Sequence, residues 1–174
     1  MGCDKANMVL ESETMAVRTA RLLSTVVESV TVLGREPIPG YGFLPDSQDF
    51  AGPLQALSCF KPCAEKVFVA ACDYPLFDPV IVTACCEKID RHPSIHAVVP
   101  MIEEHGQPLC AIFRREAFSM IPTVLAEGRK SINAWLDSLW VEWIDEPELV
   151  AAGVPLQSLK NANSPSELEA ILAE

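Results

Sequence analysis

Hydrophobic and polar positions follow two different periods along this chain, one typical of helices and the other of strands. Apolar side chains recur at helical spacing over 14–29, whereas 30–33 and 66–72 are short apolar runs of strand length. The same pattern predicts helices over 53–60, 78–89, 115–126, 131–138 and from 165 onward, and strands over 96–100, 108–113 and 140–144. Because strands alternate with helices and the 66–72 run is almost wholly apolar, we expect a single α/β domain with a mainly parallel sheet and helices on both faces.

One carboxylate follows the strand 66–72, which we expect to be the most buried strand of the sheet. Asp73 comes directly after the run 67–72, and Pro75 cannot continue a central strand because it lacks the N–H that the ladder requires. The carboxylate is therefore expected at the carboxyl edge of the sheet, where α/β proteins bind ligands. There it could hold Mg²⁺ together with substrate phosphates, or it could cap the following turn, and its position alone favours neither.

Two pairs of polar residues lie next to predicted strand or helix ends. Asn161 and Asn163 precede the last helix, which Ser164 and Glu167 are expected to open with a capping box. Alternate positions of an extended segment face the same way, so both amides could face one site, although local turn hydrogen bonds explain them as well.

The second pair, Gln107 and Arg114, brackets the predicted strand 108–113. Arg114 could clamp a phosphate or a carboxylate, and a solvated arginine at a strand end is the plain alternative.

A long loop is predicted over 35–50, which is rich in Pro, Gly and Asp. Long loops in compact domains are often functional. Asp46 lies near the end of this loop, and Gly52 would let the backbone approach a ligand closely, or would simply form a turn before the next helix.

Composition narrows the range of functions. With 174 residues the chain can bury a core of its own, and a net charge of −11 argues against a nucleic-acid partner, because such binding depends on Lys and Arg contacts with phosphates. No apolar run reaches the roughly 20 residues of a membrane helix, and the polar start does not resemble a signal peptide. The seven cysteines form no metal-ligand pattern and are expected as reduced thiols. We therefore expect a cytoplasmic protein without a membrane partner.

Five short motifs are spread over nearly the whole chain. They are Gly2-Cys3-Asp4-Lys5-Ala6; Asp46 with Gly52-Pro53-Leu54; Ala71-Cys72-Asp73-Tyr74-Pro75; Gln107-Pro108-Leu109-Cys110-Ala111; and Asn161-Ala162-Asn163-Ser164-Pro165 with Leu168. In their order they resemble the molybdenum cofactor guanylyltransferase family, the MobA-like nucleotidyltransferases. Each motif is weak alone; together they are fairly specific for the family, but less so for the nucleotide or the acceptor.

The resemblance implies a Rossmann-like nucleotidyltransferase fold. It also implies transfer of GMP from GTP to the phosphate of molybdopterin, with Mg²⁺ as cofactor and pyrophosphate as the second product. Other proteins of molybdenum cofactor biosynthesis, or molybdoenzymes, would then be the protein partners.

The resemblance further assigns roles to single residues. On the nucleotide side, Lys5 would contact the triphosphate, with Asp46 and Gly52 by the base and ribose. Asp73 would carry the metal. The residues implied on the acceptor side are Gln107, Arg114, Asn161 and Asn163, with the two asparagines close to the reacting phosphates.

The chain departs from the family at its start. Family members begin with an apolar strand and a glycine-rich loop of the form LAGGxSxR, and here Met1 falls where the methionine after that loop would be. Either the start is misassigned at an internal methionine, so that 1–174 is a domain truncated at its N-terminus, or this homologue has lost the strand and binds nucleotide poorly. In both cases we expect the 174-residue form to be poorly soluble or nearly inactive, and an upstream LAGG-type segment to restore GTP binding.

Two rival functions remain open from the sequence. One is a sister enzyme: a molybdopterin cytidylyltransferase that uses CTP, or another small-molecule nucleotidyltransferase. The other is a non-catalytic homologue that binds nucleotide or cofactor without turnover. Parallel assays with GTP, CTP and ATP, and the substitution Asp73→Asn, would separate these possibilities.

Overall fold

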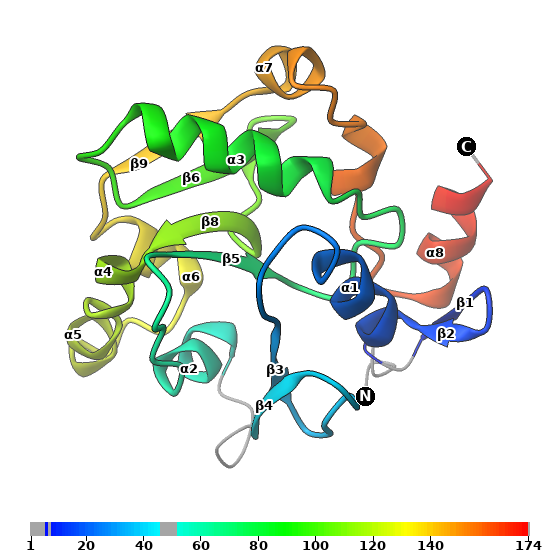
Figure 1. Cartoon of the computed structure of the whole chain (residues 1–174), viewed down its shortest axis with the longest axis horizontal. Helices are drawn as coiled ribbons and strands as arrows, with labels where there is room; N and C mark the ends of the chain where they lie inside the picture. The colour runs from blue at the N-terminus through cyan, green and yellow to red at the C-terminus, as the bar shows by residue number, and fades with distance from the viewer. Residues whose placement is uncertain (1–5, 7, 46–51, 174) are drawn as a thin grey trace.

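The computed structural model describes residues 6, 8–45 and 52–173 and has a central sheet with helices on both faces (Figure 1). The main sheet has the strand order β5-β8-β6-β9, with the short strand β7 beside the end of β6. Its strands are β5 (Lys66–Ala70), β6 (Ala97–Ile102), β7 (His105–Gly106), β8 (Cys110–Arg114) and β9 (Val141–Ile144). The expected α/β class is confirmed.

The direction of β8 is the exception to the expected parallel sheet. β8 pairs antiparallel with both β5 and β6, whereas β6 and β9 are parallel. β5, β6 and β9 therefore run the same way and end at one edge of the sheet, while β8 begins at that edge. The direction of β8 therefore decides which candidate residues can lie at the same edge of the sheet.

Strand alternation divides the core into two layers. Val98 and Ile112 face the helix α3 (Val80–Arg91), and their neighbours Val99 and Phe113 face the opposite side. On that opposite side the covering helices are α2 (Pro53–Ser58), α4 (Arg115–Phe118), α5 (Ile121–Ala126) and α6 (Ile132–Leu136). Both faces of β6 and β8 are thus buried, which explains why these segments read as nearly unbroken apolar runs.

The expectation that the 66–72 strand would be the most buried one is wrong. All five residues of β5 are only half-buried, whereas four of the five residues of β8 are buried. The reason is position: among the residues that the structure describes, β5 is the outermost strand of its sheet, and no described strand pairs with its edge away from β8. Apolar runs therefore marked the strand correctly but not its place in the sheet.

A second, separate sheet includes part of the predicted long loop. β3 (Thr31–Gly34) pairs in parallel with β4 (Gly42–Pro45), so the loop expected over 35–50 contains a short strand. β3 was expected as the strand 30–33 and is shifted by one residue.

The first predicted helix is shorter than its apolar pattern. α1 (Met15–Leu23) starts at Thr14, whose hydroxyl accepts a hydrogen bond from the N–H of Val17. It ends at Ser24 and Thr25, because their hydroxyls donate to carbonyls of the last turn and compete with continued helix.

Besides β4 and β7, four further elements of the structure were not predicted from the sequence. They are the hairpin β1 (Val9–Leu10) and β2 (Glu13–Thr14), the helix α7 (Glu146–Ala151) and a 3₁₀ helix (Leu156–Leu159). The chain ends with α8 (Pro165–Leu172), as expected. Among the described residues, none of the helices has the length and apolar character needed to cross a lipid bilayer.

Candidate functional site

Asp73 lies three residues beyond β5, at the edge where β5, β6 and β9 end. Its side chain is half-buried, and its main-chain carbonyl accepts a hydrogen bond of 2.7 Å from the N–H of Ala162. Ala162 is fully buried between Asn161 and Asn163, both of which are exposed. The structure therefore brings the asparagine segment directly against the strand end that carries Asp73, although the two are far apart in sequence.

The asparagine segment is held by the start of α8. The Ser164 hydroxyl accepts from the N–H of Glu167, as the capping box predicts. The second half of the box differs, because the Glu167 carboxylate accepts from the N–H of Asn163, at 2.6 Å, instead of that of Ser164. Glu167 therefore constrains the main chain of one of the two candidate asparagines.

The hairpin before α1 also packs on this segment. Met8, Leu10 and Met15 share a small apolar cluster with Ala162 and Leu168. The chain that follows the first motif thus lies beside Asn161 and Asn163.

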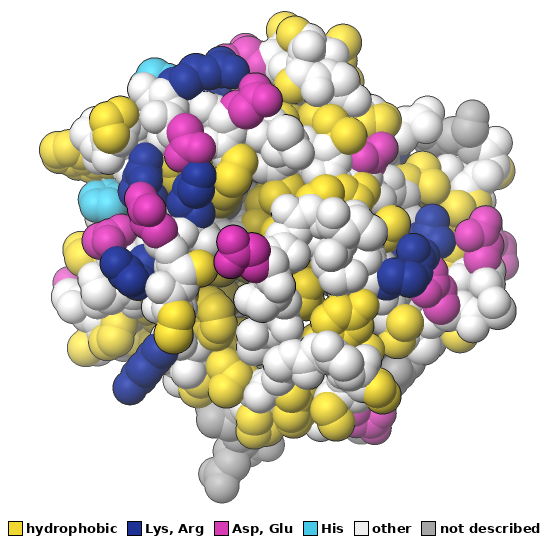
Figure 2. Space-filling model, viewed as in Figure 1, with side chains coloured by type: hydrophobic (Ala, Val, Ile, Leu, Met, Phe, Trp, Pro, Cys, Tyr) yellow, Lys and Arg dark blue, Asp and Glu magenta, His cyan; other side chains and the backbone are white. Residues whose placement is uncertain are grey.

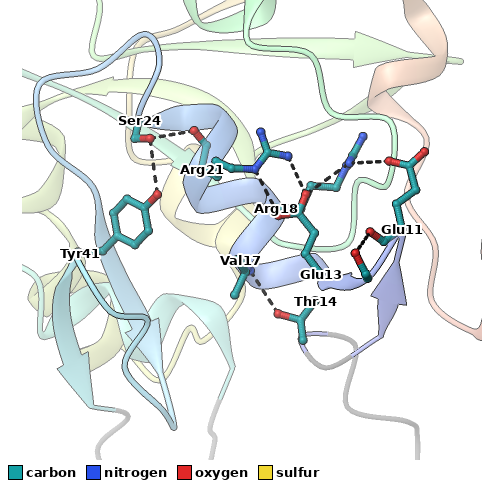
Figure 3. A network of polar contacts seen from close by, with 9 residues as sticks. Glu11, Glu13, Thr14, Val17, Arg18, Arg21, Ser24 and Tyr41 are labelled. Atoms are coloured by element: carbon teal, nitrogen blue, oxygen red, sulfur yellow. Dashed lines mark hydrogen bonds and ion pairs between the residues drawn. The ribbon is translucent and has the colours of Figure 1, made fainter.

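An ionic network fastens the same hairpin to α1 (Figure 3). Arg21 donates two hydrogen bonds to the Glu13 carboxylate, and Arg18 contacts both Glu11 and Glu13. The hydrogen bond from Arg21 holds the pKa of Glu13 below its ordinary value, and Arg18 adds to this effect. The negative charges of the hairpin are therefore paired with the arginines of α1.

Gln107 reaches the same edge because β8 begins there. Two residues after Gln107, the carbonyl of Leu109 accepts a hydrogen bond of 2.7 Å from the N–H of Ala71. The Gln107 side-chain oxygen Oε1 accepts a hydrogen bond of 3.1 Å from the hydroxyl of Tyr74. Gln107 is thus tied to the residue that follows Asp73.

Two groups next to Asp73 stay uncharged over the neutral range. Burial raises the pKa of Tyr74, and the neighbouring Cys110 and Asp73 raise it further. Burial also raises the pKa of the Cys110 thiol, with smaller contributions from Cys85 and Asp73. The carboxylate of Asp73 therefore borders a neutral, largely apolar layer on its inner side.

Arg114, which the resemblance also assigns to the acceptor side, does not join this group. It pairs with Lys66 at the far end of β5, whereas Cys110 pairs with Ala70 at the end near Asp73. Its guanidinium donates to the carbonyls of Ile89 and Ile95. The cause is the antiparallel direction of β8, which sends the two ends of one strand to opposite edges of the sheet.

Paired charges of both signs instead cover the edge that holds Arg114. In Figure 2 the dark blue side chains gather mainly on the left of this face, around the end of α3 and the start of β5 in Figure 1. Lys66 there makes a close ion pair with Asp90, at 2.7 Å. These cations stabilise local structure and lie away from Asp73.

Gly52 belongs to another part of the fold, directly before α2. Its φ of 103° is in the region that favours glycine, and no atom of the described residues would lie within 4 Å of a Cβ there. The positive φ therefore explains the glycine. Lys5 and Asp46 lie outside the described residues.

The side-chain oxygens at this edge fit a magnesium ion better than a metal that takes all of its ligands from the protein. No group of three or more His, Cys, Asp or Glu side chains that could hold a metal ion occurs in the described part of the chain. A single half-buried carboxylate, Asp73, beside amide side chains suits Mg²⁺, which usually takes one or two carboxylates and completes its shell with waters and substrate phosphates.

Tyr74 is the residue of this edge to which the sequence analysis assigned no role. As a single aromatic residue between Asp73 and Pro75 it reads as core, and it is indeed 3% exposed. Only the pairing of β5 with β8 reveals its hydrogen bond to Gln107.

Comparisons with known proteins show the family of the chain. A family model described as MobA-like NTP transferase domain matches residues 1–143. A protein of Desulfosudis oleivorans named molybdenum cofactor guanylyltransferase is 30% identical over 174 residues, which cover 97% of this chain and 85% of that protein. A protein of Synechococcus elongatus named probable molybdenum cofactor guanylyltransferase is 26% identical, covering 98% of this chain and 91% of that protein.

Two solved structures share the fold. Molybdopterin-guanine dinucleotide biosynthesis protein A from Archaeoglobus fulgidus superposes with a TM-score of 0.70 at 19% identity, covering 98% of this chain and 89% of that one. A 2-C-methyl-D-erythritol 4-phosphate cytidylyltransferase from Thermus thermophilus gives a TM-score of 0.70 at 16% identity, covering 97% of this chain and 92% of that one. From its motifs, its fold and the family match together, the chain belongs to the MobA-like NTP transferase domain family and is a nucleotidyltransferase.

Proposed function

We propose that this protein transfers GMP from GTP to the phosphate of molybdopterin, with Mg²⁺ as cofactor. One observation carries the proposal: the hydrogen bond between Ala162 and the Asp73 carbonyl, which places Asp73, Asn161 and Asn163 at one edge of the sheet. The names of the relatives support the choice of nucleotide and acceptor.

The reaction asks mainly for positioning. An oxygen of the molybdopterin phosphate attacks the α-phosphorus of GTP, the bond from that phosphorus to the bridging oxygen breaks, and pyrophosphate leaves. The attacking phosphate is already an anion at neutral pH, so no strong general base is required. Holding the two reactants in line and offsetting their charge supply most of the rate in such transfers.

Asp73 would hold Mg²⁺, which would neutralise charge on the phosphates when bound. Asn161 and Asn163 would donate amide N–H groups to phosphate oxygens beside it, and both side chains are exposed for that purpose. Gln107 would lie on the acceptor side of the same edge.

The nucleotide side of the proposal rests on residues away from this group. Lys5 would contact the triphosphate, and Asp46 with Gly52 would lie by the base and ribose. Because the chain carries a net charge of −11, its overall field repels nucleotide, so a local cation such as Lys5 and the metal matter more. None of the six cysteines that the structure describes is in a disulfide, which agrees with a reducing cytoplasmic location.

The test is a transfer assay with purified protein, molybdopterin and each of GTP, CTP and ATP, with Mg²⁺ or with excess EDTA. We expect product with GTP and Mg²⁺ only. Asp73→Asn should lose most turnover while staying folded, because its main-chain bond to Ala162 does not involve the carboxylate. Product from CTP alone would identify a cytidylyltransferase. No product with any nucleotide, despite tight binding, would identify a non-catalytic homologue.

A further inference from the structure

Tyr74 connects two of the segments that build the candidate site. Its ring is packed in the core beside Phe77, Ile81 and Cys110, and it is only 3% exposed. Its hydroxyl lies 3.1 Å from Oε1 of Gln107. The phenol therefore spans from the strand end of Asp73 to the segment before β8.

The direction of this hydrogen bond follows from the second contact of the same amide. Nε2 of Gln107 donates to the carbonyl of His105, at 3.3 Å, and a carbonyl can only accept. The amide must therefore turn Oε1 toward Tyr74, and the tyrosine must be the donor.

The main chain of Gln107 is already fixed, so Tyr74 acts on the side chain. The Gln107 N–H donates to Pro100, and its carbonyl accepts from Cys110. The remaining freedom is rotation of the amide, which the phenol removes. One hydrogen of Nε2 then has no partner within the described ranges, and the half-buried side chain leaves it open to an oxygen atom of a ligand.

We infer that Tyr74 is a positioning residue, which holds the amide of Gln107 so that Nε2 donates to an oxygen of the phosphate-bearing acceptor. The inference rests on the proposed function, since it takes Gln107 to be on the acceptor side. It goes beyond the proposed function by naming Tyr74 as the core residue that controls the affinity for the acceptor. Because Tyr74 directly follows Asp73, the same residue also fixes how far Gln107 lies from the proposed metal ligand.

The test is Tyr74→Phe, which keeps the ring and removes only the donor. We expect the KM for molybdopterin to rise about three- to tenfold, the effect of losing one hydrogen bond, with the KM for GTP changed less than about twofold. In a Gln107→Ala background the same substitution should have no further effect on the acceptor KM, because the group through which Tyr74 acts is gone. Phe77→Leu is the matched control: it disturbs the same apolar cluster and should lower stability without changing the acceptor KM.

The outcomes separate this inference from the proposed function. Wild-type protein that makes no product with any nucleotide refutes the function. Equilibrium binding of molybdopterin to the wild type and to the same variants then decides the inference. Weaker binding by Tyr74→Phe, absent in the Gln107→Ala background, supports it. Equal changes in both KM values, an undiminished effect without Gln107, or no binding of molybdopterin by the wild type would overturn it.

Discussion

Lys88 is a charged residue buried within the helical layer, and it is far less exposed than the carboxylates with which it pairs. Its Nζ lies 2.6 Å from Oε2 of Glu148 and 3.7 Å from Glu142, so the pair joins α3 to α7 and to β9. The Lys88 side chain is 10% exposed, whereas those of Glu148 and Glu142 are 50% and 41% exposed. Removing the charge of Lys88 should therefore change stability by a different amount from removing the charge of Glu148.

We predict that Glu148→Gln destabilises the protein more than Lys88→Met does. The first change leaves an ammonium in the core with only the more distant Glu142 as a counterion. Breaking a fully buried pair in this way costs about 3–5 kcal/mol, and the remaining contact with Glu142 should reduce the loss to about 2 kcal/mol. The second change removes the buried charge and leaves two hydrated carboxylates, so the loss should be about 1 kcal/mol or less.

The double variant Lys88→Met/Glu148→Gln tests the reasoning directly. We expect it to be more stable than Glu148→Gln alone, because the unpaired ammonium is gone. Glutamine is the matched replacement, since its side-chain oxygen can still accept from the N–H of Asp145 as Glu148 does. The assay is urea unfolding at pH 7, with the slope of the transition required to stay constant among variants.

The pH dependence should follow the same pair. The hydrogen bond from Lys88 holds the pKa of Glu148 below its ordinary value of 4.5. A carboxyl whose pKa is lower in the folded state contributes stability above its unfolded pKa and loses it as the pH falls through the folded value. The gap between wild type and Glu148→Gln should therefore narrow below about pH 4.5. Two results would refute the argument. One is that Lys88→Met lowers the free energy of unfolding as much as Glu148→Gln or more. The other is that the double variant loses as much free energy of unfolding as the two single variants together.

Three further predictions concern the site and its surroundings. Glu167→Ala should lower turnover up to about tenfold while the fold persists, because Asn163 loses its main-chain partner; Glu169→Ala on the exposed side of α8 is the control, and equal activity of both would contradict the role. Gly106→Ala should lower stability by about 1–2 kcal/mol in thermal unfolding, since its Cβ would lie 2.6 Å from the Trp143 ring; recovery is expected when Trp143→Leu is added. A fused upstream segment of the form LAGGxSxR should tighten GTP binding in calorimetry, because one edge of β5 has no partner strand among the described residues; equal affinity of the 174-residue form would show that the segment is not needed.

The sequence by itself determined the elements and the end of the key strand. Apolar runs, glycines and prolines placed most helices and strands within a few residues, because these signals depend on local backbone preferences. Asp73 before Pro75 identified a strand end with a carboxylate, and the five motifs identified the family. The Ser164 cap was also readable, since a cap involves residues only three apart.

Only the tertiary structure decided which strand ends meet. Strand direction is set by pairing between distant segments, so nothing near Gln107 or Arg114 shows that β8 runs backwards and separates them. The half-exposed edge position of β5 and the hydrogen bond from Tyr74 to Gln107 have the same origin. Local periodicity specifies which face of a strand is apolar, whereas the order, direction and register of strands depend on long-range hydrogen bonds that the chain forms only when it folds.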